Sequence, residues 1–181
     1  MKKYKTDLIR YYGNFSYKNL IKGLLLVPGF QYMFHLRNLQ SRHKLDPVYW
    51  ISFVFFVFLR FFYGFQIPIA SKIGKGFYIG HYGTIVLNAG TVIGDNCNIA
   101  HNVTIGQTNR GSKMGGPIIG SKVWMGTGSV IVGKVSIGDN VLIAPNSYIN
   151  FDVPSNSIVI GNPAIIYKSD SAVDEYIINI V

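Results

Sequence analysis

The sequence predicts a mainly β protein, a parallel β-helix preceded by an α-helical segment. Two observations carry this prediction. From Ile73 onward, a bulky aliphatic residue followed by a small one returns every six residues, which is the repeat signature of a β-solenoid. The first third lacks that repeat and is aromatic and basic instead. The 181 residues suffice for one buried domain and a small appendage, expected as a helical segment (1–65), a β-helix (66–168) and a tail (169–181).

Positive charge is concentrated in the first third of the chain. Residues 1–66 hold ten Lys or Arg against Asp7 and Asp46, which gives +8 of the total +9. Basic charge is typical of nucleic-acid-binding proteins, but no nucleic-acid motif accompanies it, so no such partner is expected. The single cysteine, Cys97, excludes an intrachain disulfide. Without a short cleavable apolar segment at the amino terminus, the chain is expected in the cytoplasm.

Helices are expected throughout the first third. Residues 4–42 mix aromatic, aliphatic and basic residues and predict short helices with a break at Pro28-Gly29. Asp46 followed by Pro47 predicts the start of a longer, almost wholly apolar helix. Its apolar run of about twelve residues before Arg60 is shorter than the roughly 20 that span a bilayer. Two interpretations stay open: this helix packs against the β-helix or a partner subunit, or it binds an anionic membrane at the inner face of the cytoplasmic membrane.

The six-residue repeat defines the β-helix hexad by hexad. The aliphatic residue of each hexad is expected in the core, and Gly, Asn and Asp suit the turns. The step from Ile85 to Ile93 is two residues too long, which predicts a bulge there. The segment 107–118, QTNRGSKMGGPI, predicts a loop that leaves the solenoid. Hexads begin at residues 73, 79, 93, 99 and 105 and again at 119, 125, 131, 137 and 143.

The hexads IGDNCN, IAHNVT and IGDNVL, with the closing GNPAIIYK at residues 161–168, resemble the hexapeptide-repeat acyltransferases. Within that family, residues 66–168 are similar to the branch that contains serine acetyltransferases and related sugar and capsular-polysaccharide O-acetyltransferases. The pattern is closest to the sugar enzymes. The resemblance implies a left-handed β-helix with three hexads in each coil, acetyl-CoA as co-substrate without a metal, and a homotrimer that binds acetyl-CoA between two β-helices.

His81 and His101 are the candidate catalytic residues. Each is the third residue of its hexad, and their separation of twenty residues equals one coil of three hexads plus the two-residue bulge. Both side chains are therefore expected on the same edge of neighbouring coils, about 4.8 Å apart. The resemblance assigns His81, in IGHYGTIVLN, as the general base that takes the proton from the acceptor hydroxyl. His101 is the second candidate.

The surroundings of His81 predict a sugar hydroxyl as acceptor, in capsular or exopolysaccharide biosynthesis. In serine acetyltransferases an aspartate precedes the catalytic histidine and an Arg-His-Pro triplet ends the loop, whereas this chain has Gly80 and Gly115-Gly116-Pro117. The charged clamp for a zwitterion is thus missing. Serine is the alternative acceptor. The aromatic and amide side chains expected to bind the acceptor are Tyr78, Tyr82 and Asn88.

The resemblance also implies that acetyl-CoA lies along small residues of successive coils, with a lysine near its phosphates. Gly106 is in addition the expected N–H donor to the developing oxyanion. The complete set of residues expected at acetyl-CoA is Gly106, Gly126, Thr127, Gly128, Ala144 and Lys168.

Two other classes of function are compatible with a β-helix. A zinc carbonic anhydrase on this fold needs three histidines, and the β-helix segment contains His81 and His101 alone. A non-catalytic trimeric scaffold would keep the fold without the chemistry. Cys97 lies on the six-residue repeat and is expected in the core, where it is no nucleophile.

Overall fold

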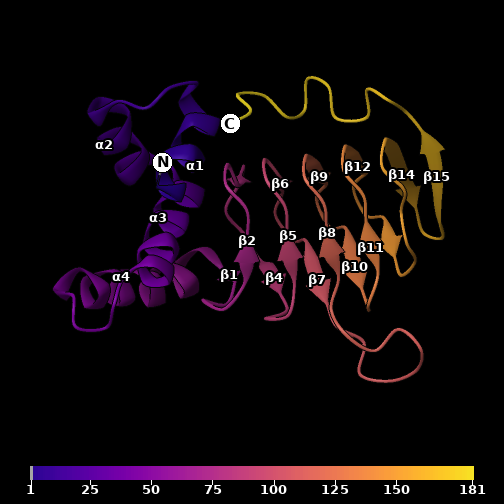
Figure 1. Cartoon of the computed structure of the whole chain (residues 1–181), viewed down its shortest axis with the longest axis horizontal. Helices are drawn as coiled ribbons and strands as arrows, with labels where there is room; N and C mark the ends of the chain where they lie inside the picture. The colour runs from indigo at the N-terminus through magenta and orange to yellow at the C-terminus, as the bar shows by residue number, and fades with distance from the viewer. Residues whose placement is uncertain (1) are drawn as a thin grey trace.

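The computed structural model describes residues 2–181, and it places four helices at one end of a β-helix (Figure 1). Proline occupies the first position of the third and fourth helices, where its missing N–H leaves no hydrogen bond unmade. The Asp46 carboxylate caps the fourth helix by accepting a hydrogen bond from the Val48 N–H at 2.8 Å. The predicted break at Pro28 and the predicted helix start at Pro47 are confirmed. The helices are α1 (Lys3–Tyr12), α2 (Tyr17–Leu26), α3 (Pro28–Ser41) and α4 (Pro47–Tyr63).

Beyond α4 the chain winds through three parallel sheets, which form the sides of a triangular prism. Sheet A consists of β1 (Phe65–Gln66), β4 (Ile85–Leu87), β7 (Thr104–Gly106), β10 (Val130–Val132) and β13 (Tyr148–Ile149). Sheet B consists of β2 (Lys72–Ile73), β5 (Val92–Ile93), β8 (Ile118–Ile119) and β11 (Ser136–Ile137). Sheet C consists of β3 (Tyr78–Ile79), β6 (Asn98–Ile99), β9 (Val123–Met125), β12 (Val141–Ile143), β14 (Ser157–Gly161) and the antiparallel β15 (Ala164–Lys168). The predicted fold class, a left-handed parallel β-helix with a helical amino-terminal segment, is confirmed.

The aliphatic residues that open the hexads form the core, as predicted. Ile93 pairs with Ile73 in the coil before it and with Ile119 in the coil after it, and all three are at most 2% exposed. The small residue that follows is required by the closeness of the coils. A Cβ on Gly94 would lie 2.6 Å from the carbonyl oxygen of Gly120, so only glycine fits there.

The longer step in the first coil lies at a different place from the one predicted. Leu87, and not Ile85, pairs with Ile105, so the two extra residues fall between Ile79 and Leu87, in the turn that follows β3. Ile85 and Leu87 are both buried, and alternation in the sequence therefore could not choose between them. The predicted bulge between Ile85 and Ile93 is wrong for that reason.

The predicted loop lies between β7 and β8, at residues 107–117. Ile118 is already part of β8, so the loop is one residue shorter than expected. Thr108 and Gly115 exchange two backbone hydrogen bonds of 3.1 and 3.0 Å, which close the base of the loop as in a hairpin. The Lys113 carbonyl accepts a hydrogen bond from the Lys134 N–H at 2.9 Å. The loop is thus fastened to the next coil at its base and near its tip.

Buried arginines fix the helices on the first coil. Arg37 of α3 forms an ion pair with Asp7 of α1 at 2.9 Å, with both side chains almost fully buried, and it donates to the Ile73 carbonyl at 2.8 Å. Arg10 donates to the Gly76 carbonyl at 2.6 Å. Because a buried charge is tolerated only when it is paired and hydrogen-bonded, these contacts specify how the helices dock. Among residues 2–181, no helix combines the length and apolarity needed to cross a membrane.

The tail, residues 169–181, runs back along the β-helix toward the helices (Figure 1). Ile177 is buried against Leu142 of β12, and the ring of Tyr176 lies 5.0 Å from that of Trp124 of β9. The tail therefore covers part of the outer face of sheet C.

Candidate active site

His81 and His101 lie on one edge of the prism, as predicted. His81 belongs to the turn between β3 and β4, and His101 belongs to the turn between β6 and β7. Ile79 pairs with Ile99, so each histidine stands two residues past a paired position. Their ring centroids are 5.7 Å apart and the rings are almost perpendicular, at 88°. We call this edge, formed by the turns from sheet C to sheet A, the histidine edge.

The backbone around His101 leaves little free space. Gly83 adopts φ +131°, and a Cβ there would lie 3.1 Å from the His101 Cβ. The His101 carbonyl accepts a hydrogen bond from the Gly128 N–H at 3.2 Å. Within residues 2–181, the buried Nδ1 of His101 has no hydrogen-bond partner. This nitrogen is enclosed by the protein, whereas the exposed ring of His81 faces solvent.

The end of α4 supplies a wall of the histidine edge. The Gly83 N–H donates to the Tyr63 carbonyl at 3.0 Å, and the Tyr82 ring lies 6.2 Å from the Tyr63 ring. The Tyr63 hydroxyl bonds Gln31 at 2.7 Å, and burial raises the pKa of Tyr63. No pattern in the sequence predicted Tyr63 as a site residue. Its one signal was the position directly before Gly64, where the helix ends and the β-helix begins.

The three residues predicted to bind the acceptor are not gathered around His81. Tyr82 is on the histidine edge and is 69% exposed. The Tyr78 ring instead packs on Tyr11 of α1, with centroids 4.4 Å apart, so it joins the helices to the first coil. Asn88 lies at the opposite end of β4, where its side chain donates to Gln107 at 3.2 Å, at the root of the loop.

Of the residues predicted at acetyl-CoA, Thr127 stands in line with the two histidines. Met125 pairs with Ile99, so Thr127 occupies the position of His101 one coil further on. The glycines on either side of Thr127 are needed by the stacking of coils. A Cβ on Gly126 would lie 2.6 Å from the Pro145 nitrogen, and Gly128 has φ +71°.

The remaining residues of that set lie apart from one another. Gly106 ends β7, so it lies across sheet A from His101. Ala144 packs against the buried tail residues, and Lys168 is exposed on β15. Within one chain, these positions do not line a single groove.

Cys97 is a core residue, as predicted. It is fully buried, and its thiol donates to the Gly120 carbonyl at 3.2 Å. Burial raises the pKa of Cys97 to about 12, so the thiolate needed for nucleophilic attack does not form. Among residues 2–181, no three His, Cys, Asp or Glu side chains come together as metal ligands.

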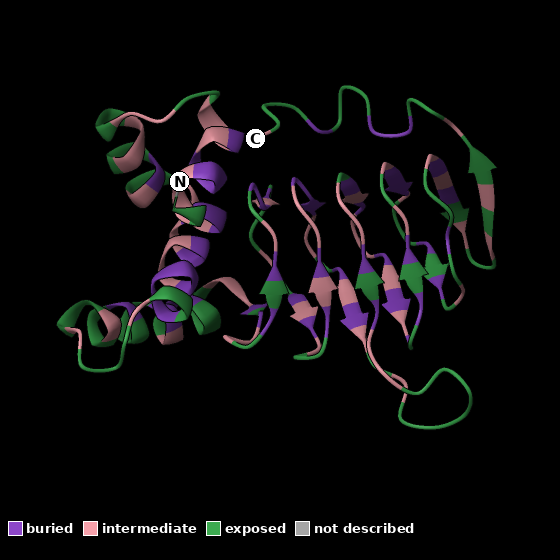
Figure 2. Ribbon diagram, in the orientation of Figure 1, coloured by how far each residue is buried: buried purple, intermediate pink, exposed green. Residues whose placement is uncertain are grey.

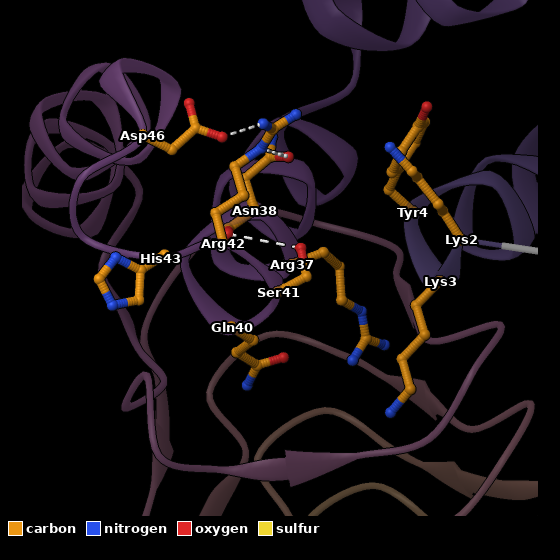
Figure 3. Close-up of a pocket in the computed structure, with 10 residues that line it drawn as sticks. All are labelled: Lys2, Lys3, Tyr4, Arg37, Asn38, Gln40, Ser41, Arg42, His43 and Asp46. Atoms are coloured by element: carbon orange, nitrogen blue, oxygen red, sulfur yellow. Dashed lines mark hydrogen bonds and ion pairs between the residues drawn. The ribbon is translucent and has the colours of Figure 1, made fainter.

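A cavity of about 620 Å³ lies elsewhere, among the helices (Figure 3). Three of its cations have partners: Arg42 pairs with Asp46, Arg37 pairs with Asp7, and Lys3 donates to the Ile73 carbonyl at 2.8 Å. The lining includes His43 but neither His81 nor His101, so the cavity lies apart from the paired histidines.

The comparisons with known proteins agree on one kind of enzyme. Residues 116–150 match the bacterial transferase hexapeptide (six repeats) family. The serine acetyltransferase of Helicobacter pylori is 33% identical over 147 residues, which cover 81% of this chain and 85% of that protein. The Staphylococcus aureus serine acetyltransferase is 39% identical over 111 residues, or 61% of this chain and 52% of that protein.

Solved structures give the same result. The serine complex of the Neisseria gonorrhoeae serine acetyltransferase superimposes with a TM-score of 0.72 at 28% identity, over 91% of this chain and 67% of that one. The coenzyme A complex of the Brucella abortus enzyme gives a TM-score of 0.75 at 26% identity, over 92% and 67% of the two chains. These relatives act on serine, which contradicts the closer resemblance to sugar enzymes expected from the sequence.

Proposed function

Because the chain belongs to the serine acetyltransferase family, we propose that it moves the acetyl group of acetyl-CoA to the hydroxyl of L-serine. The observation that carries this proposal is the relationship to the Helicobacter pylori enzyme along 85% of its length, together with paired histidines on one edge. The predicted sugar acceptor and role in polysaccharide biosynthesis are wrong. The physical reason is that two of the side chains thought to favour a sugar, Tyr78 and Asn88, are engaged away from His81.

In the proposed reaction His81 is the general base. Its imidazole takes the hydroxyl proton of serine as the oxygen attacks the acetyl carbon; the C–O bond forms, the C–S bond breaks, and coenzyme A leaves as the thiol after receiving a proton. A base that titrates near neutral pH suits this step. His81 is exposed at the edge, so a substrate reaches it directly.

His101 is proposed to assist from the neighbouring coil. The two rings lie 5.7 Å apart at nearly a right angle, so a substrate that contacts His81 also comes close to the ring of His101. Thr127 continues the same line of positions toward later coils. The proposed path of acetyl-CoA along small residues therefore runs past Thr127 to the histidines.

The charges of serine need partners, and Gly80 supplies none. The loop carries two cations, Arg110 and Lys113. Lys113 is bound to the Asn150 carbonyl, whereas Arg110 is exposed. A carboxylate is best held by a guanidinium, so we expect Arg110→Ala to raise KM for serine about tenfold or more with little change in KM for acetyl-CoA. Equal KM values for serine in both proteins would contradict this role.

A homotrimer completes the proposed site. The histidine edge and the loop lie on different edges of the prism, at opposite ends of the sheet A strands. A second copy that places its loop over the histidine edge of the first would bring both halves of the site together. Closed rings of this kind are common among homo-oligomers.

The direct test uses the purified full chain with acetyl-CoA and L-serine. Release of coenzyme A is followed with a thiol reagent, and the product is identified as O-acetylserine by mass spectrometry. D-serine and buffer alone are the controls. A chain that assembles but releases no thiol with L-serine would be a scaffold, and the proposed activity would be wrong.

A further inference from the structure

We propose that α4 binds the surface of an anionic membrane and lies in the interface parallel to it. Figure 2 shows exposed positions along α4, and most of the side chains at these positions are apolar. Six of its side chains are between 55% and 82% exposed, and we call them the α4 apolar face: Trp50, Ile51, Val54, Phe58, Phe61 and Phe62.

This arrangement is the reverse of an ordinary surface helix, whose polar side faces water. The side of α4 that packs on the protein includes the buried residues Ser52, Phe56 and Leu59, so one stripe of the helix already packs against the fold. A second apolar stripe on the same helix has no partner within residues 2–181. Contiguous exposed apolar surface of this kind marks an interaction site.

Charge favours a lipid surface over a second copy of the chain. Lys44 precedes α4 and Arg60 flanks its apolar face, and both side chains are exposed. Residues 1–66 together carry +8. Two such segments facing each other would repel, whereas anionic lipids attract each Lys or Arg near their surface. Aromatic side chains in a basic helix are typical of interfacial anchors.

The fold keeps α4 flat on such a surface. The helix has 17 residues, about 26 Å in length at 1.5 Å per residue, and it is shorter than the roughly 30 Å hydrocarbon core. Phe56 packs on Tyr32 of α3 with ring centroids 4.9 Å apart, and Phe55 stacks on His35 at 5.0 Å. Because these contacts hold the inner side of α4 against α3, its outer side is the one that meets lipid.

Tryptophan fluorescence gives a direct reading of this contact. The chain has two tryptophans, and Trp124 packs beneath the tail. In a Trp124→Phe protein, emission therefore reports Trp50, on the α4 apolar face. We expect a blue shift on addition of phosphatidylcholine vesicles that contain phosphatidylglycerol, and a loss of the shift at high salt. Emission that does not change with these vesicles at low salt would overturn the proposal.

Flotation with the same vesicles tests the surface itself. Val54→Glu/Phe58→Glu should weaken binding about tenfold for each side chain, because both are exposed and neither belongs to the core. The matched control, Ile165→Glu/Tyr167→Glu, changes two exposed apolar residues (57% and 52%) of β15 at the other end of the molecule. It should float like the original chain.

Two results would count against the membrane. Equal flotation of Val54→Glu/Phe58→Glu and the control would show that α4 is not the contact. A halved oligomer mass of Val54→Glu/Phe58→Glu in light scattering, with no flotation of the original chain, would show that the face joins two copies. Acetyl transfer to serine should be unchanged in Val54→Glu/Phe58→Glu, since α4 binds lipid independently of the proposed chemistry.

Discussion

His81 and His101 occupy equivalent positions of neighbouring coils, yet they differ in exposure. His81 is open to solvent, while His101 is partly enclosed against Gly83. We therefore expect His81→Ala to lower kcat by about 10² to 10⁴, and His101→Ala to lower it less, about tenfold. Thiol release is the measurement, with His43→Ala, an exposed histidine between α3 and α4, as the control. A larger loss of kcat in His101→Ala than in His81→Ala would show that His101 is the general base and His81 the assisting residue.

His35 makes the stability of the helices depend on pH. Burial lowers the pKa of His35 from 6.5 to about 4. Between these two pH values the imidazole is protonated in the unfolded chain and neutral in the folded chain. Stability attributable to His35 is full above pH 6.5 and is lost as the pH falls toward 4. Because the His35 ring is partly exposed and solvent screens its charge, we expect the original chain to lose about 1 kcal/mol more than His35→Leu between neutral pH and pH 5, in urea unfolding at one chain concentration. Parallel losses in both proteins would refute this.

Glycines that follow core aliphatic residues set the spacing of the coils. A Cβ on Gly120 would lie 2.8 Å from the Gly138 carbonyl oxygen, whereas a Cβ on Gly90 meets only the movable Asn88 side chain at 3.2 Å. Gly120→Ala should lower the free energy of unfolding by about 2 kcal/mol or more, and Gly90→Ala by clearly less. Thermal unfolding followed by circular dichroism compares the two. Equal losses would mean that the coils can separate locally.

The repeat in the sequence predicted the elements well and their junctions less well. A bulky aliphatic residue returns at one position of each six-residue unit, so only that position can be the buried one. This spacing correctly predicted the core residues Ile73, Ile93 and Ile119. Ile85 and Leu87 are both buried, so the place of the two extra residues could not be deduced. The contact of Tyr63 with the histidine edge depends on how α4 docks, and no local pattern encodes docking.

At the scale of the whole molecule, two edges of the prism divide the proposed site. Asn88 and the loop lie at one end of the sheet A strands, and the histidines lie at the other. The acceptor prediction failed because it treated residues near His81 in sequence as neighbours in space. Spacing along one coil predicts which side chains share an edge, as it did for His81 and His101. It says nothing about residues that a second copy brings to that edge.

A shared site makes a quantitative prediction for mixed oligomers. In one chain His81→Ala removes the base. In another, residues 109–114 are replaced by Asn-Gly, which keeps the Thr108–Gly115 base of the loop and suits a two-residue turn. Each alone should be inactive. Because every site in a closed trimer takes histidine and loop from different chains, random co-assembly of equal amounts should restore about a quarter of the original activity. Co-expression with two affinity tags and thiol release provide the measurement. No recovery in verified mixed trimers, or full activity of the loop variant alone, would place the whole site within one chain.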